Sequence, residues 1–219
     1  MKIALVVILC GVSALCTAQD PWKNIYSQHA WAQRDEWQKA EELIALLRIH
    51  DGSHVADIGC HEGYMTFKLA SEVGKKGTVY AVDLDQGKLE KLKRRADEHE
   101  LRQIRAIRGQ QTDPQLPAGV LDAVLILDTY HEMGKPANML QQIKTALKNG
   151  GRLVICEPIA EARKESPREE QEKKHELALR FAVDDLRKAG FKIVHQKEKF
   201  IDRTQEKGDW MWVVVGEKM

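Results

Sequence analysis

Short apolar runs alternate with amphipathic stretches along most of this chain. Apolar runs bounded by turn residues predict strands, and apolar positions spaced three and four residues apart predict helices. The strands are expected at His54–Ile58, Thr78–Val82, Ile104–Arg108, Leu121–Leu127, Arg152–Cys156, Phe191–Glu198 and Trp210–Glu217. The helices are expected at Trp31–Leu47, Tyr64–Val73, Gln86–Glu98, Pro136–Leu147 and Glu176–Ala189.

This alternation predicts an α/β fold with a doubly wound, mostly parallel sheet of seven strands and helices on both faces. The last two strands are joined by a charged turn that contains Gly208, so we expect them to form a C-terminal antiparallel pair. The charged segment Glu157–Lys174 contains Pro167 and is expected to be a long mobile loop or a solvated helix.

The first 18 residues do not fit this alternation. Lys2 is followed by an apolar run, and Cys16-Thr-Ala18 offers small residues for cleavage, so residues 1–18 are expected to be a secretory signal peptide. Residues 19–50 then form an N-terminal helical arm, and residues 51–219 form the main domain. The protein is therefore expected to be exported, periplasmic or secreted, with an uncleaved N-terminal anchor as the alternative.

Charge and cysteine content narrow the function further. The chain has 34 basic and 33 acidic residues, and removal of Lys2 with the signal leaves a net charge of zero. A neutral chain is not expected to bind nucleic acid, which requires a basic surface. Only Cys60 and Cys156 remain beyond the signal, and their place at the ends of different strands favours two free thiols over a cysteine metal site.

The segment Val55–Gly63 carries the strongest chemical signal. An apolar strand ends in Asp57, and Gly59 and Gly63 follow, which lets the backbone turn sharply and start a helix close to a ligand. A dinucleotide site requires a further glycine, but His61 stands in its place. Acidic side chains also repel a pyrophosphate, so a nicotinamide oxidoreductase is disfavoured. S-adenosylmethionine carries a sulfonium and an ammonium and has no phosphate, so it suits this loop better.

At these residues the chain resembles the class I S-adenosylmethionine-dependent methyltransferases, which have a Rossmann-like fold, and in motif order the ubiquinone/menaquinone-biosynthesis type. The resemblance covers about Val55 to Pro158, and Ala146–Gly151 matches a family turn with Asn149 in place of proline. It implies that Asp83 binds the ribose hydroxyls, that Leu84 covers the adenine and that Gln110 or Gln111 meets the adenine amine. The remaining cofactor-binding residues that it implies are Asp57, Gly59, Cys60, His61, Gly63 and Asp128.

The segment Leu127–Glu132 matches the part of the family that lines the methyl pocket. Histidine is the natural base near neutral pH, so His131 is the preferred catalytic base and Glu132 the second. A structural role for His131 as a cap of the following helix is an equal alternative. A divalent metal held by His131, Glu132 and Asp128 is considered and disfavoured, because the spacing is not diagnostic.

The sequence leaves the roles of four further residues undecided. His61 either shapes the methionine end of the site or makes a structural hydrogen bond in its loop. His175 is either a lid residue or a solvated surface histidine, with the second favoured. On the N-terminal helix, Arg34 and Trp37 are candidates to contact the site, although Trp37 is typical of a core anchor.

The sequence thus predicts an S-adenosylmethionine-dependent methyltransferase that acts on a small-molecule acceptor. The alternative is a non-catalytic protein that binds S-adenosylmethionine or a related nucleoside as a sensor or partner. A simpler interpretation, in which Asp57 and Asp83 are only turn and cap residues, competes with both. Export is in tension with this cofactor, because S-adenosylmethionine is made inside cells.

Overall fold

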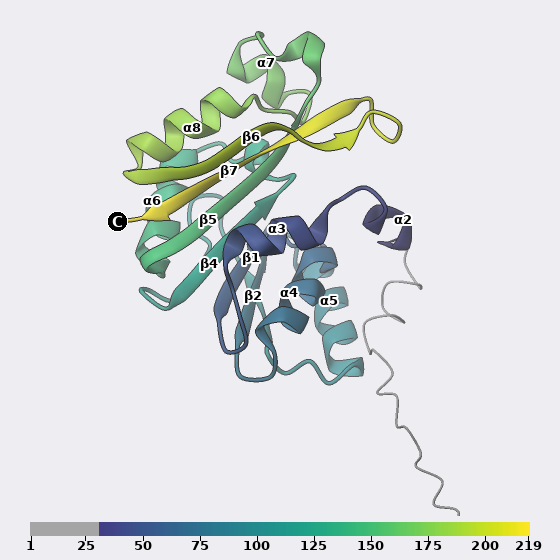
Figure 1. The fold of residues 1–219 in the computed structure, drawn as a ribbon. Coiled ribbons are helices and arrows are strands. Elements are labelled where there is room, and N and C mark those ends of the chain that lie inside the picture. Colours follow the sequence, from purple (N-terminus) through teal and green to yellow (C-terminus); the bar gives the residue numbers. More distant parts are fainter. Residues whose placement is uncertain (1–30) are drawn as a thin grey trace, which may run out of the picture.

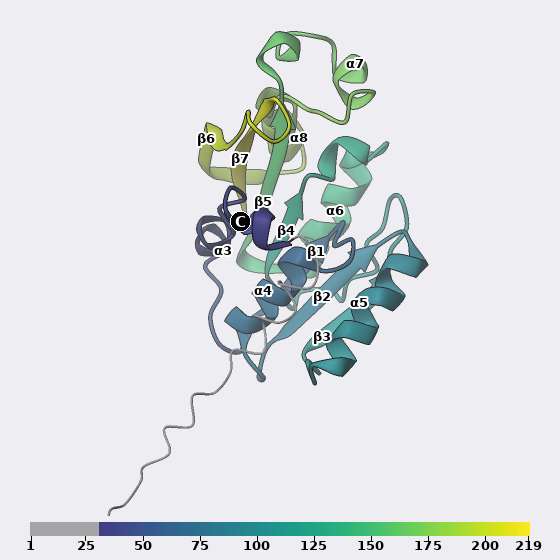
Figure 2. The same cartoon turned by 90° about the vertical axis from the view of Figure 1, so that its right-hand side faces the viewer.

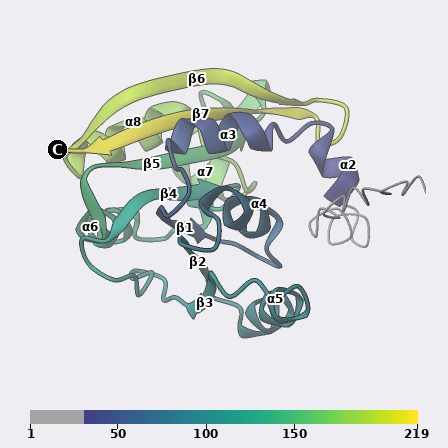
Figure 3. The same cartoon turned by 60° about the horizontal axis from the view of Figure 1, so that its bottom comes forward.

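The structure is a computed structural model, and it describes residues 31–219. The expected signal peptide and residues 19–30 of the expected arm lie outside this part. A seven-stranded sheet with the order β3-β2-β1-β4-β5-β7-β6 forms the centre, as Figures 1 and 3 show. Its strands are β1 (His54–Ile58), β2 (Thr78–Asp83), β3 (Ile104–Arg108), β4 (Leu121–Leu127), β5 (Leu147–Ile159), β6 (Phe191–Arg203) and β7 (Asp209–Lys218).

Strands β1 to β5 pair in parallel, and β7 pairs antiparallel with both β5 and β6. The predicted α/β fold with an antiparallel C-terminal pair is therefore confirmed. The chain passes from β3 at one edge to β4 beside β1, so the strand order reverses between β1 and β4. In doubly wound sheets ligands bind at this reversal, outside the carboxyl ends of the strands.

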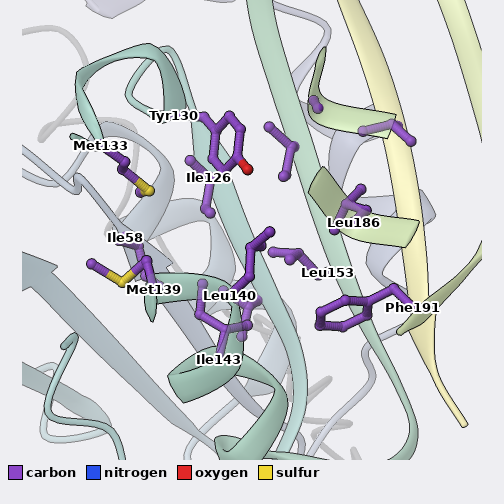
Figure 4. Packing of buried hydrophobic residues seen from close by; sticks show 14 of the residues in the cluster. Ile58, Ile126, Tyr130, Met133, Met139, Leu140, Ile143, Leu153, Leu186 and Phe191 are labelled. Carbon is purple, nitrogen blue, oxygen red and sulfur yellow. The ribbon is translucent and has the colours of Figure 1, made fainter. Parts of the chain in front are cut away.

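Helices cover both faces because residues alternate across each strand: Val55 packs in one core and Ala56 in the other. Figure 4 shows part of the larger core, where Leu140 and Ile143 of α6 lie near Leu153 of β5. Figures 1 and 2 show α7 beyond the end of the sheet, above α8. The helices are α2 (Trp31–Asp35), α3 (Ala40–Leu47), α4 (Tyr64–Val73), α5 (Gln86–Glu98), α6 (Pro136–Ala146), α7 (Arg168–Glu172) and α8 (Leu179–Lys188), with short 3-10 turns at η1 (Tyr130–Glu132) and η2 (Glu161–Arg163).

The expected single helix Trp31–Leu47 is wrong, because the chain forms α2 and α3 with a break before Ala40. Lys39 adopts a left-handed conformation with φ 51°, and Gln38 is fully buried. Gln38 accepts a hydrogen bond from Arg34 Nε at 2.8 Å. The break lets α3 pack on the sheet while α2 turns toward α4, so a buried polar residue overrides the helical periodicity.

Neither of the two expectations for Glu157–Lys174, a long mobile loop or a solvated helix, describes the whole segment, although the short helix Arg168–Glu172 within it is partly exposed. Strand β5 continues to Ile159, and two short helices, η2 and α7, follow. The buried amide of Gln171 donates hydrogen bonds to the backbone carbonyls of Arg163, Lys164 and Ser166, which fixes the segment.

Several boundaries shift as well. Helix α6 ends at Ala146, and Asn149–Gly151 lie within β5 instead of stopping the helix. Helix α8 begins at Leu179 because Glu176, buried at 5% exposure, pairs instead with Arg163. Within residues 31–219, every helix is too short or too polar to cross a membrane.

Candidate functional site

A cavity of about 600 Å³ opens at the carboxyl ends of β1, β2 and β4, where the strand order reverses. This volume lies in the range of small-molecule sites. Its walls come from the loop after each of these strands, from the loop after β3, and from α2. The sequence expected a ligand site at this position, and the structure places a cavity there.

The loop between β1 and α4 forms the floor of the cavity. Gly59 has φ +78°, and a Cβ added to it would lie 2.3 Å from Oγ1 of Thr129. Gly63 has φ +100° and precedes α4. His61 itself has φ +51°, a conformation that favours glycine but that histidine adopts more readily than most residues. The backbone thus keeps a glycine-like path although the side chain is an imidazole.

Asp57 is the residue before the end of β1, and its side chain lines the cavity and is only 3% exposed. Oγ1 of Thr66 donates a hydrogen bond to its Oδ2 at 2.6 Å. Burial raises the pKa of Asp57 to about 6, against the lowering effects of Thr66 and of the Arg34 charge. A buried carboxylate whose partner is a hydroxyl on α4 is not a turn or cap residue, so the simpler interpretation of Asp57 does not describe its contacts.

Asp83 connects the loops that follow β1 and β2. Its Oδ2 accepts a hydrogen bond from the backbone of His61 at 2.9 Å, and its Oδ1 accepts one from the backbone of Asp85 at 2.9 Å. The cap of α5 is Asp85, whose side chain accepts hydrogen bonds from two backbone amides of that helix. Leu84 beside it lines the cavity and is 51% exposed, one of three exposed large apolar side chains in residues 31–219.

The backbone amide of His61 donates to Asp83 of the neighbouring loop, a contact that does not decide between the two interpretations of the His61 side chain. Its side chain also lines the cavity, and burial lowers the pKa of the ring. Cys60 lines the cavity too, where burial raises the pKa of the thiol well above its usual value. Cys60 and Cys156 are both free and buried, as the sequence predicted.

Gln110 and Gln111 follow β3, and both line the cavity. The backbone of Gln110 exchanges hydrogen bonds with that of Asp113, at 2.7 and 3.3 Å. The structure therefore brings the two candidate glutamines to the same wall and does not choose between them.

Asp128 lines the cavity after β4 in a left-handed conformation, with φ 54°. Its Oδ2 is 2.9 Å from Nη1 of Arg203, a buried residue at the end of β6. Arg203 also binds Asp209 through Nε and Nη2, at 2.7 and 2.9 Å. The C-terminal hairpin thus fixes one carboxylate of the site.

His131 does not line the cavity, and its side chain is only 3% exposed. Its Nδ1 lies 2.5 Å from Oε2 of Glu157, which is fully buried. Burial lowers the pKa of His131, but the hydrogen bond and charge of Glu157 outweigh it, and the net pKa is raised. Nδ1 of His131 therefore makes a buried contact with β5 and not with the following helix, where the structural alternative expected it, while Nε2 faces Glu132 at 3.8 Å.

Glu132 lines the cavity with a side chain that is 61% exposed. His175 lies on its other side, with Nδ1 3.6 Å from Oε1 of Glu132. The rings of His131 and His175 are 5.5 Å apart and nearly perpendicular. His175 is 75% exposed and outside the cavity lining, so it lies at the rim and is not packed over the site.

Of the two residues expected on an N-terminal helix, Arg34 and Trp37, only Arg34 contributes to the cavity. Arg34 lines the cavity, with its guanidinium 4.1 Å from the centre of the Tyr64 ring, and burial lowers its pKa. Trp37 packs against the hydrophobic core and does not line the cavity. Trp31 of α2 is also part of the wall, and its ring contacts Tyr64.

Glu157 is the main residue of this region that the sequence did not single out. Its two oxygens accept hydrogen bonds from the backbones of Thr129 and Tyr130, at 2.6 and 2.8 Å, as well as from His131. A usable signal was present, since Glu157 follows an apolar run in the way that Asp57 and Asp83 do.

The lining carries more acidic than basic side chains, a charge balance that suits a cationic ligand. The acidic groups are Asp57, Glu62, Asp83, Asp85, Asp128 and Glu132, and the Lys and Arg side chains are Arg34 and Lys88.

Comparison with known proteins agrees with this geometry. A family model described as "Methyltransferase domain" matches residues 49–214. Aklanonic acid methyltransferase DauC of Streptomyces sp. strain C5 is 31% identical over 122 residues, 55% of this chain and 54% of that protein. Demethylmenaquinone methyltransferase of Symbiobacterium thermophilum is 26% identical over 139 residues, 63% of this chain and 53% of that protein. The chain thus spans about half the length of these curated relatives.

Solved structures show the same fold. A SAM-dependent methyltransferase from Aquifex aeolicus superposes with a TM-score of 0.73 at 20% identity, covering 91% of this chain and 99% of that one. Geranyl diphosphate C-methyltransferase from Streptomyces coelicolor A3(2) gives a TM-score of 0.70 at 14% identity, covering 87% and 82%. The chain belongs to the methyltransferase-domain family and has the fold of class I S-adenosylmethionine-dependent methyltransferases.

Proposed function

We propose that this protein binds S-adenosylmethionine in the cavity and transfers its methyl group to a small-molecule acceptor. The observation that carries the proposal is the chemistry of the walls. Carboxylates lie at the carboxyl ends of two neighbouring strands, the exposed apolar Leu84 follows one of them, and acidic groups outnumber basic ones. A nucleoside with a cationic end matches this set, and a pyrophosphate does not.

The residues assigned to the cofactor divide into two groups, one for its adenosine part and one for its methionine end. Asp83 is the ligand for the ribose hydroxyls, Leu84 covers one face of the adenine, and Gln110 or Gln111 meets its amine. Asp57 offers a negative charge to the ammonium of the methionine end, and Arg34 offers a positive one to its carboxylate. These roles are supported by the place of each side chain on the cavity wall.

Bound S-adenosylmethionine supplies an electrophilic methyl group, and the protein contributes by holding donor and acceptor in line. An oxygen or nitrogen acceptor also loses a proton. At the acceptor end Glu132 faces the cavity, and Nε2 of His131 lies 3.8 Å behind it. His131 is therefore not placed to touch an acceptor in the way that the sequence alone suggested.

The cavity lining is partly apolar, since it includes Leu127, Met139 and Met133, the residue that follows Glu132. Figure 4 shows Met133 and Met139 on the same side of the core, next to Ile58. The aklanonic acid and demethylmenaquinone methyltransferases that resemble this chain carry the names of small molecules. These observations support a small-molecule acceptor with an apolar body.

Methyl transfer from radiolabelled S-adenosylmethionine tests the proposal. The purified protein is incubated with a panel of phenols, quinols and thiols, and formation of labelled product and of S-adenosylhomocysteine is measured. Transfer to at least one acceptor is expected, with loss of transfer in Glu132→Gln. Tight binding of the cofactor without transfer to any acceptor would favour a non-catalytic sensor instead.

A further inference from the structure

Two histidines and one carboxylate meet at the rim of the cavity. Nε2 of His131 is 3.8 Å from Oε1 of Glu132, and Nδ1 of His175 is 3.6 Å from the same oxygen. One ligand atom from each residue lies within 4.8 Å of the other two. Ligand atoms around a tetrahedral zinc ion with bonds of about 2.05 Å are about 3.3 Å apart, so the two distances to Glu132 must each shorten by about 0.5 Å or less, and the distance between the two imidazole nitrogens by about 1.5 Å at most.

The buried histidine is oriented as metal-binding histidines usually are. Nδ1 of His131 is held at 2.5 Å by Glu157, a carboxylate with no exposed surface. In metal sites the second ring nitrogen commonly donates to a carboxylate, which fixes the ring and makes the ligating nitrogen more basic. This contact directs Nε2 of His131 toward Glu132 and His175.

A second grouping, of Asp128, His131 and Glu157, has ligand atoms equally close. It is a poorer site because its carboxylates are already engaged. Asp128 is paired with Arg203, and Glu157 accepts hydrogen bonds from the backbones of Thr129 and Tyr130. By contrast, Glu132 is 61% exposed and His175 is 75% exposed, so an ion can reach them from solvent.

We propose that His131, Glu132 and His175 form a binding site for a divalent transition metal ion, with Glu157 holding His131 in position. Two imidazoles and one carboxylate suit Zn²⁺, Co²⁺ or Fe²⁺, whereas Mg²⁺ and Ca²⁺ prefer sites made of oxygen ligands. Three protein ligands leave at least one coordination position open, as in catalytic metal sites.

The site also bears on the acceptor. Glu132 belongs both to the metal site and to the cavity lining, so the open position is next to the acceptor end of the cavity. If the proposed function holds, the acceptor is a molecule whose reacting oxygen or sulfur can bind a metal ion, such as a catechol-like diol or a thiol. The metal site itself does not rest on the proposed function.

Titration of the tag-free full chain with Co²⁺ tests the site, followed by visible absorption and by competition with Zn²⁺. The wild-type protein is expected to bind one Co²⁺ that Zn²⁺ displaces. His175→Ala and Glu132→Gln each remove one exposed ligand and are expected to weaken Co²⁺ binding at least tenfold. His195→Ala removes an exposed histidine of β6 and is the matched control, with wild-type affinity expected.

Equal Co²⁺ affinity in the wild type and His175→Ala would overturn the metal site. Calorimetry with S-adenosylmethionine on the same samples separates the two proposals. Cofactor binding without metal binding would leave the proposed function standing and remove the metal site. Metal binding without cofactor binding would leave the metal site standing and remove the proposed function.

Discussion

Nδ1 of His131 and Oε2 of Glu157 are 2.5 Å apart, and both side chains are buried. The two residues come from neighbouring strands, His131 just after β4 and Glu157 within β5. Since Glu157 also receives backbone amides of Thr129 and Tyr130, one carboxylate shapes the segment that forms the acceptor end of the cavity.

The first prediction concerns the stability that this carboxylate provides. Glu157→Ala leaves buried amides and a buried imidazole without their acceptor, and is expected to lower the free energy of unfolding by about 3–5 kcal/mol. Glu157→Gln keeps one acceptor oxygen and is expected to cost less, about 1–3 kcal/mol. Urea denaturation measures both, with the exposed Glu165→Ala as control. A loss below about 1 kcal/mol in Glu157→Ala would contradict this account.

The second prediction separates backbone strain from close packing at Gly59. Gly59→Ala places a Cβ 2.3 Å from Thr129 in a left-handed backbone conformation. Gly119→Ala imposes the same type of conformation, with φ +67°, in open space. Gly119→Ala is expected to cost about 1–2 kcal/mol of unfolding free energy, and Gly59→Ala about 1–3 kcal/mol more. Equal losses in thermal or urea unfolding would show that the approach of Thr129 does not matter.

The third prediction concerns the pH dependence of cofactor binding. Because the pKa of Asp57 is raised to about 6, its carboxylate is mostly neutral at pH 5 and mostly charged at pH 7. If the charged form binds the cofactor, affinity for S-adenosylmethionine is expected to rise about tenfold over this interval. Calorimetry at both pH values measures this rise. A similar rise in Asp57→Asn would show that another group is responsible.

The fourth prediction concerns the effect of Asp57 on the stability of the ligand-free protein. A rise in pH is expected to lower this stability, whereas it raises the affinity for the cofactor. The folded state holds the proton of Asp57 more tightly than the unfolded state, whose carboxyl has a pKa of 3.8. The contribution of Asp57 to the free energy of unfolding therefore falls as pH rises from about 4 to about 6, by about 3 kcal/mol. Urea midpoints across this range should show a larger decrease in the wild type than in Asp57→Asn.

Much of the sheet and the cavity floor could be predicted from sequence because the signals are local. An apolar run that ends in Asp57 or Asp83 can be recognised in the sequence alone, and so can the two glycines on either side of His61. Strand order then places these residues together, since carboxyl ends of parallel strands meet at one edge.

Other features depend on contacts between distant segments. The break before α3 follows from the burial of Gln38, and the ordered segment before α8 follows from the burial of Gln171. His175 meets His131 only because η1 and the segment after α7 lie at the same end of the sheet. Periodicity carries no information about such contacts, so the sequence could predict an exposed His175 but not that it lies beside His131 and Glu132.

The central claim is that Asp57 and Asp83, at the carboxyl ends of two neighbouring strands, lie at a site for S-adenosylmethionine. Calorimetry with S-adenosylmethionine, S-adenosylhomocysteine and NAD tests it most directly, on the wild type and on Asp83→Ala. We expect both sulfur nucleosides to bind and NAD not to bind, with Asp83→Ala losing about 1.5–3 kcal/mol of binding free energy. Binding of neither sulfur nucleoside below millimolar concentration, or unchanged affinity in Asp83→Ala, would contradict the account.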